Sequence, residues 1–187
     1  MRILKFILKI VLFPFVLLWK LIKLIFKQFN KIRIGKFLKT LSVAKLDALS
    51  GEEFENVCKL IFEYVGYQVK TTPASNDYGA DLIITKKLTI VVQAKLYYKH
   101  GVGNHAVQEV TSALKFYKAH FAAVITNWKF TNQAQTMAQT QAVVLIDRQD
   151  LDCFFEDLEN KTKTSKLFCL EKHFKANVKE LNKNILK

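Results

Sequence analysis

Residues 1–33 carry a long apolar pattern that is broken mainly by lysines. The run 10–19 contains no charged side chain. On a helix that turns 100° per residue, six lysines fall within an arc of roughly 80°. The segment therefore predicts an apolar helix with one basic stripe. The stripe consists of Lys5, Lys9, Lys20, Lys23, Lys27 and Lys31.

Two membrane interpretations of this helix stay open. A spanning helix needs about 20 apolar residues, and 3–22 qualifies only if Lys5, Lys9 and Lys20 extend their ammonium groups to the interface. A helix lying in the interface needs only the apolar face and the basic stripe. Pro14 mildly disfavours a straight span. A core helix of a soluble domain is a weaker interpretation. We do not expect a cleaved signal peptide, because Lys20 and bulky residues follow the run.

From Asp47 onward the pattern changes to that of an α/β domain. Ser50 and Glu53 have the spacing of a capping box, which predicts the start of a helix. An apolar stripe of helical period continues to Val65, and Gly66 is a suitable C-terminal glycine. A short strand at 67–72 and a loop rich in turn residues at 73–79 follow.

Two short apolar segments, 81–85 and 89–95, predict a hairpin. A two-residue turn would point Asp81 away from Gln93. A three-residue loop at 86–88 would instead pair these two residues on one face. We expect the second arrangement or an equivalent bulge.

The rest of the chain alternates helical and strand patterns. Its continuous apolar strands favour a sheet that is covered on both faces. The predicted fold class is α/β: an αβββαβ core with a mixed central sheet flanked by helices, plus the N-terminal hydrophobic basic helix. The expected elements are a loop at 96–104, a helix at 105–118, a strand at 121–126, a helix around 132–140, a strand at 142–147 and a helix at 150–159. The expected divisions are a membrane anchor and linker at 1–45, a domain at 46–160 and a lysine-rich helical tail at 161–187.

Most of the net charge of +13 belongs to the N-terminal segment. Residues 1–46 hold eleven Lys and Arg and no acidic residue, whereas the remaining 141 residues hold eighteen basic and sixteen acidic groups. The whole-chain charge is therefore no argument for nucleic-acid binding by the domain. Three cysteines without a close pair argue against a disulfide framework and a cysteine-based zinc site, and fit a reducing compartment.

The strand TIVVQAK ends with Gln93 and Lys95 on one face, because side chains alternate along a strand. A buried lysine without a partner costs several kcal/mol. We therefore expect Asp81, and Glu55 from the helix 51–65, to share this face. Two carboxylates and an amide oxygen suit Mg²⁺, which prefers oxygen ligands. A neighbouring lysine can steady a nucleophile and developing charge.

Four segments resemble the Mrr-type restriction endonuclease domain: GEEFE at 51–55, DYGAD at 77–81, VVQAK at 91–95 and FAAVIT at 121–126. This domain is a branch of the PD-(D/E)xK nuclease superfamily in which glutamine replaces the usual acid of the last motif. The resemblance covers roughly residues 46–155. It implies an αβββαβ core, Mg²⁺-dependent cleavage of DNA phosphodiester bonds (with Mn²⁺ as the alternative cation) and often a preference for modified DNA.

Matched position by position, the resemblance implies a catalytic core of Asp81, Gln93 and Lys95, with Glu55 as the helix-borne acid. The implied metal ligands are Asp81, Gln93 and Glu55. The family often has a second glycine where Tyr78 stands, which leaves the shape of this loop open.

Each candidate also has a purely structural interpretation. Asp81 could begin a strand after a turn, Lys95 and Gln93 could be polar residues of an edge strand, and Glu55 could be a surface acid. We interpret three neighbours as solvated surface residues, namely His100, His105 and Gln108.

The leading hypothesis is a membrane-tethered, Mg²⁺-dependent endonuclease that makes restriction-type cuts in foreign or modified DNA. Its expected partners are double-stranded DNA, membrane lipid through residues 1–36, and a second copy in a homodimer. The expected location is the cytoplasmic face of a membrane, in a bacterium the inner membrane. Two alternatives remain: a non-catalytic DNA-binding module, suggested by the neutral Gln93, and a membrane-surface scaffold in which the basic leader is the functional part.

Overall fold

The computed structural model describes residues 2–73 and 78–185 and divides the chain into two compact units, 1–36 and 37–187. The first unit is formed by helix α1 (Arg2–Leu38), which continues through Pro14. Side chains 12–30 of α1 are exposed, including many large apolar ones. Among the residues that the structure describes, none of the helices combines the length and the apolar composition that crossing a membrane requires.

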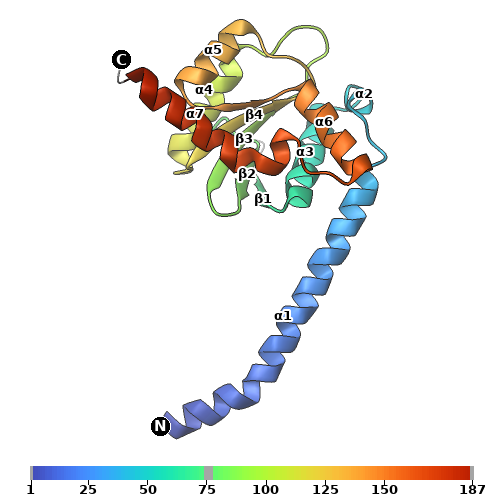
Figure 1. Cartoon of the computed structure of the whole chain (residues 1–187), viewed down its shortest axis with the longest axis vertical. Coiled ribbons are helices and arrows are strands. Elements are labelled where there is room, and N and C mark those ends of the chain that lie inside the picture. Colours follow the sequence, from blue (N-terminus) through green and yellow to red (C-terminus); the bar gives the residue numbers. More distant parts are fainter. Residues whose placement is uncertain (1, 74–77, 186–187) are drawn as a thin grey trace. The chain divides into compact units, whose positions relative to one another are not determined.

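A five-stranded mixed sheet forms the centre of the second unit (Figure 1). The strands lie in chain order. They are β1 (Gln68–Thr71), β2 (Leu82–Thr85), β3 (Thr89–Lys95), β4 (Phe121–Thr126) and β5 (Val144–Ile146). The pairs β1–β2 and β2–β3 are antiparallel, while β3–β4 and β4–β5 are parallel. The prediction of a mixed sheet flanked by helices is confirmed.

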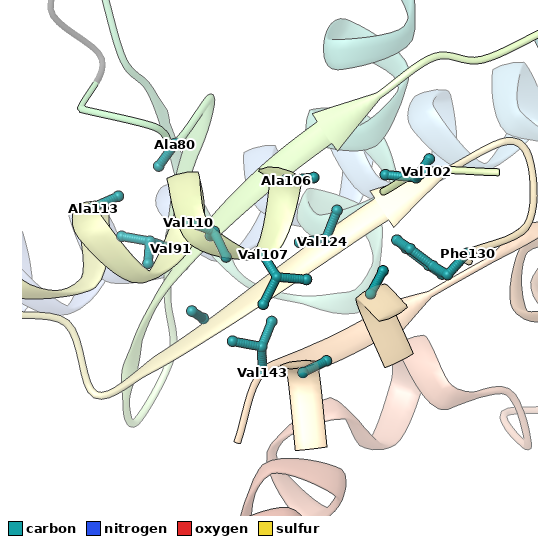
Figure 2. Packing of buried hydrophobic residues seen from close by; sticks show 13 residues of the cluster. Ala80, Val91, Val102, Ala106, Val107, Val110, Ala113, Val124, Phe130 and Val143 are labelled. Carbon is teal, nitrogen blue, oxygen red and sulfur yellow. The ribbon is translucent and has the colours of Figure 1, made fainter. Parts of the chain in front are cut away.

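Helices cover both faces of this sheet (Figure 1). The helices of the second unit are α2 (Val43–Leu46), α3 (Gly51–Val65), α4 (Asn104–Phe116), α5 (Asn132–Thr140), α6 (Arg148–Asn160), the 3₁₀ helix η1 (Lys166–Cys169) and α7 (Leu170–Ile185). Val91 of β3 belongs to a buried cluster with α4 and α5, in which Val107 and Val110 also take part (Figure 2). Ile90 and Val92 point to the other face, where α3 contacts the sheet, and they are buried too.

The start and end of α3 are as the sequence predicts. The Glu53 N–H donates to Ser50 Oγ over 3.3 Å, and the Ser50 N–H donates to Glu53 Oε2 over 2.7 Å, which completes the capping box. Gly66 ends the helix with φ 105°, in the left-handed region that glycine favours. The apolar stripe of α3 is buried, which fixes this helix against the domain. The first candidate segment, GEEFE at 51–55, therefore lies on a firmly held helix.

The register of the hairpin is also the one predicted. Thr85 pairs with Thr89 across the three-residue loop 86–88, and Leu82 pairs with Val92. Continuing this register places the residue before Leu82 opposite Gln93. A one-residue slip would have sent the two side chains to opposite faces.

The C-terminal part differs from the prediction in the start of one helix. Helix α6 begins at Arg148 because Asp147 is its N-cap, two residues before the expected start. The segment predicted as a helical tail contains η1 and α7, and Phe174 of α7 is fully buried, stacked on Phe121 with ring centroids 4.7 Å apart. The short helix α2 was not predicted.

Candidate active site

Asp81 and Gln93 meet at the end of the β2–β3 hairpin. Gln93 is buried in β3 with an exposed fraction of 4%. Its Nε2 donates to Asp81 Oδ2 over 2.7 Å, and the Ala94 backbone N–H donates to the same oxygen over 2.6 Å. Ala80, directly before Asp81, is fully buried in the cluster under α4 (Figure 2), which fixes the chain at this point. The predicted juxtaposition of Asp81 and Gln93 is therefore confirmed.

The other end of the Gln93 amide has no partner within the described part of the chain. With Nε2 turned to Asp81, the buried Oε1 accepts no hydrogen bond from any residue that the structure describes. A buried acceptor left in this state costs about 1–3 kcal/mol. A bound cation, or water held by a cation, would remove this cost.

Glu55 and Asp81 both influence one buried thiol of α3. Burial raises the pKa of the Cys58 thiol well above its usual value, and the negative charges of Asp81 and Glu55 raise this pKa further. The two predicted acids therefore act on the same part of α3, and their meeting at one cation stays a prediction.

Lys95 has a partner that the sequence did not predict. Its Nζ lies 2.9 Å from Oε2 of Glu109 on α4, and the two side chains are exposed by 29% and 27%. We expected Asp81 and Glu55 to share the face of Lys95, and Glu109 adds a carboxylate from the helix that follows β3 and packs over that face. Sequence reasoning missed Glu109, although one signal was available. Glu109 is the single acid of α4 and lies at helical spacing from the buried Ala106 and Ala113.

Two further contacts fix Glu109. His105 Nδ1 lies 3.1 Å from Glu109 Oε1, and its side chain is 79% exposed, as expected for a surface residue. Gly79 lies against the backbone of Glu109, and a Cβ added to Gly79 would stand 2.4 Å from the Glu109 carbonyl oxygen. Gly79 has φ 89° and Tyr78 has φ 53°, so Tyr78 keeps a conformation that glycine favours. Asp77, the first residue of the DYGAD motif, lies outside the described residues.

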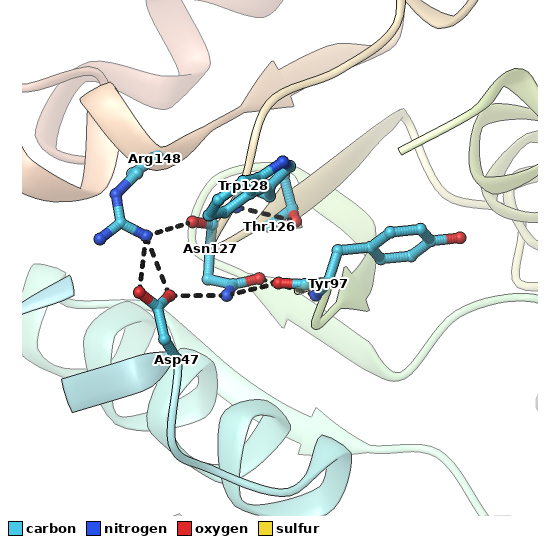
Figure 3. A network of polar contacts seen from close by, with 6 residues as sticks. All are labelled: Asp47, Tyr97, Thr126, Asn127, Trp128 and Arg148. Carbon is cyan, nitrogen blue, oxygen red and sulfur yellow. Dashed lines mark hydrogen bonds and ion pairs between the residues drawn. The ribbon is translucent and has the colours of Figure 1, made fainter. Parts of the chain in front are cut away.

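A polar network lies just beyond the ends of β3 and β4 (Figure 3). The buried Asn127 accepts from the Tyr97 N–H over 2.8 Å and donates to the Tyr97 carbonyl over 2.9 Å. It also donates to Asp47 Oδ1 over 2.8 Å, and Arg148 forms an ion pair with Asp47. Burial raises the pKa of the Asp47 carboxyl, but hydrogen bonds from Arg148 and Asn127 outweigh this effect and hold the pKa below its usual value. The network fixes the segment that leaves β3 after Lys95.

The candidate residues offer oxygen ligands for a hard cation. Within the described ranges, no group of three or more His, Cys, Asp or Glu side chains is arranged to hold a metal ion. The candidate set is smaller, with the carboxylates of Asp81 and Glu55 and the amide oxygen of Gln93. Mg²⁺ is usually held by one or two carboxylates together with several waters. The unpartnered Gln93 Oε1 fits such a cation.

Comparisons with known proteins found similar solved structures and one matching family model. No curated protein matches the sequence. Similar solved structures include the protein of unknown function AF1548, with 14% identity and a TM-score of 0.45 over 50% of this chain and 55% of that chain. The DNA modification-dependent restriction endonuclease AspBHI is 15% identical, with a TM-score of 0.46 over 80% of this chain and 40% of AspBHI. MspJI restriction endonuclease in complex with a 27-mer oligonucleotide is 20% identical, with a TM-score of 0.42 over 82% of this chain and 35% of MspJI.

The chain therefore spans between about a third and about half of the length of these proteins. The family model described as Restriction endonuclease matches residues 46–155, more than half of the chain. This range contains all four candidate residues and agrees with the resemblance of the motifs. The chain belongs to the Mrr-type restriction endonuclease family, whose members are nucleases that act on DNA.

Proposed function

We propose that the protein is an endonuclease that hydrolyses DNA phosphodiester bonds and depends on a divalent cation, Mg²⁺ or in its place Mn²⁺. The observation that carries the proposal is the Asp81–Gln93 pair, joined over 2.7 Å, in which the buried Gln93 Oε1 has no partner among the described residues. A restriction-type role, directed at foreign or modified DNA, follows from the family and is part of the proposal.

Each candidate residue has a role in this mechanism. Asp81 and Gln93 Oε1 would hold the cation, and Glu55 would approach it directly or through a water. When bound, the cation supplies a polarised phosphoryl oxygen and a more acidic water. The Lys95 ammonium stabilises negative charge that develops on the phosphate oxygens, at a point where the surrounding protein excludes much of the solvent.

Plasmid cleavage tests the proposal. The full chain is incubated with supercoiled plasmid, methylated and unmethylated, in Mg²⁺ or in EDTA. We expect nicking or cutting in Mg²⁺ only, and none with Asp81→Asn or Lys95→Ala. Asp152→Asn, which changes an exposed carboxylate of α6, is the matched control and keeps full activity. Salt-dependent DNA binding without cleavage in any metal would instead favour the non-catalytic module.

We propose further that α1 binds a membrane surface as an interfacial helix. Its support is the combination of a basic stripe with exposed apolar side chains, among them Leu17 at 50%, Trp19 at 57% and Leu24 at 64%. The Lys23 ammonium lies 3.5 Å from the centroid of the Trp19 ring. This proposal would put the nuclease domain on the cytoplasmic face of a membrane, and a homodimer remains a prediction.

Vesicle sedimentation tests the membrane proposal. The full chain is mixed with vesicles of neutral lipid alone or with anionic lipid added. We expect stronger binding to the anionic vesicles, weaker binding at high salt, and loss of binding in the double variant Leu17→Glu with Leu24→Glu. Equal binding of the double variant would contradict the proposal.

A further inference from the structure

We propose that Glu109 is a positioning residue that holds the Lys95 ammonium in place for catalysis. This inference rests on the proposed function, in which Lys95 acts on the scissile phosphodiester. Glu109 itself touches neither DNA nor metal in this proposal. It acts through Lys95.

The two oxygens of Glu109 have different surroundings. The Oε2 atom is buried and lies 2.9 Å from Lys95 Nζ. The two atoms form an ion pair, but their alignment is not that of a hydrogen bond. Oε1 faces His105, which is largely exposed. Because Oε2 is buried, the contact with Lys95 is partly shielded from water, and we expect it to be stronger than a fully exposed surface pair, which contributes about 0–1 kcal/mol.

The backbone of Glu109 is fixed from two sides. Ala106 and Val110, its neighbours along α4, are buried in the cluster against the sheet. On the other side, Gly79 comes so close that even a Cβ would clash with the Glu109 carbonyl. Gly79 lies two residues before Asp81, so the backbone of Glu109 contacts the DYGAD loop while its side chain contacts Lys95. Glu109 therefore connects the DYGAD loop, which leads to Asp81, with the end of β3 that carries Lys95.

A lysine needs such a link more than other catalytic residues. Its ammonium is carried on a flexible four-carbon stem and has no preferred direction of its own. Misplacement of a catalytic group by about 1 Å can cost a factor on the order of 10² in rate. Removal of the Glu109 charge should leave the ammonium present but less well placed.

The first test observes Lys95 without any reaction. The ε-methylene resonance of Lys95 in the full chain is assigned by its loss in Lys95→Arg. We expect this resonance to shift in Glu109→Gln. It should stay in place in Asp150→Asn, which removes the carboxylate from the Lys166–Asp150 pair of comparable exposure. An unshifted resonance in Glu109→Gln would overturn the proposal.

The second test separates rate from binding. We expect Glu109→Gln to lower kcat for plasmid cleavage by about tenfold with an unchanged KM, at a temperature where both the variant and the wild type are fully folded. Glu109→Asp, which keeps the charge, should recover part of the loss, and Asp150→Asn should keep the wild-type kcat. An unchanged kcat in Glu109→Gln, or a loss matched by Asp150→Asn, would contradict the positioning role.

The two tests also keep this inference apart from the proposed function. If the wild-type protein cleaves no DNA in any divalent metal, the proposed function fails, and the resonance of Lys95 alone then decides whether Glu109 positions it.

Discussion

Gln93 donates its side-chain amide to the carboxylate of Asp81 over 2.7 Å. Because the amide is neutral and donates a hydrogen bond, the two side chains can stay in contact whether or not a cation is bound. A glutamate at 93 would instead place two negative charges side by side. The glutamine therefore makes the site less dependent on metal for its own stability, while its Oε1 remains available as a ligand.

The substitution Gln93→Glu should make folding depend on metal. In EDTA we expect a loss of about 3 kcal/mol, because an uncompensated charge is left in a buried position. Mg²⁺ should restore most of this loss, so the melting temperature of the variant should rise more on addition of Mg²⁺ than that of the wild type. Gln133→Glu, on the exposed side of α5, is the control. If Mg²⁺ raised the melting temperature of the variant and of the wild type by the same amount, a cation between residues 81 and 93 would be contradicted.

The substitution Gly79→Ala should damage both the fold and the activity. A Cβ would stand 2.4 Å from the Glu109 carbonyl, and φ is 89°, so the loop must move away from α4. We expect a loss of about 2 kcal/mol or more in the free energy of unfolding, together with loss of cleavage. The control is Gly51→Ala, where nothing lies within 4 Å and the effect should be neutral or slightly stabilising. Urea unfolding measures the stability of both variants. An equal loss of stability at the two glycines would contradict this explanation.

The sequence predicted the hairpin register because only one loop length puts Asp81 and Gln93 on the same face. It predicted both ends of α3 because the capping box and the C-terminal glycine are local signals. The partner of Lys95 could not be predicted in the same way. Glu109 lies fourteen residues further along the chain, and its place depends on how α4 crosses the sheet. Asn127 was missed for the same reason, since its partners come from three separate segments.

The substitution Asn127→Ala should cost about 3 kcal/mol of stability. Asn127 is fully buried and satisfies the N–H and the carbonyl of Tyr97, which would both lose their partner. Chemical unfolding of the full chain measures the loss. Asn132→Ala, on the exposed side of α5, should stay within about 0.5 kcal/mol of the wild type. If Asn127→Ala lost no more stability than Asn132→Ala, the network in Figure 3 would contribute little to the stability of the fold.

Asp157 should make stability depend on pH. Burial raises the pKa of its carboxyl, but the Thr162 hydroxyl and the N–H groups of Ser165 and Thr164 outweigh this and hold the pKa far below its usual value. A lowered pKa in the folded state means that this stabilisation is present above the unfolded pKa, about 4, and is lost as the pH falls below it.

We therefore expect Asp157→Asn to be about 2 kcal/mol less stable than the wild type at pH 7, and the difference to shrink towards pH 3. Urea unfolding at pH 7 and pH 3 measures this difference in the free energy of unfolding. The control is Asp152→Asn, on the exposed side of α6. A difference that is the same at both pH values would contradict the assignment.

Binding of Mn²⁺, followed by electron paramagnetic resonance of the free ion, tests most directly whether Asp81 and Gln93 hold a cation. The account predicts one strong site in the full chain that Mg²⁺ displaces, that is lost in Asp81→Asn, and that is retained in Asp152→Asn. Equally strong binding by Asp81→Asn and by the wild type would contradict it.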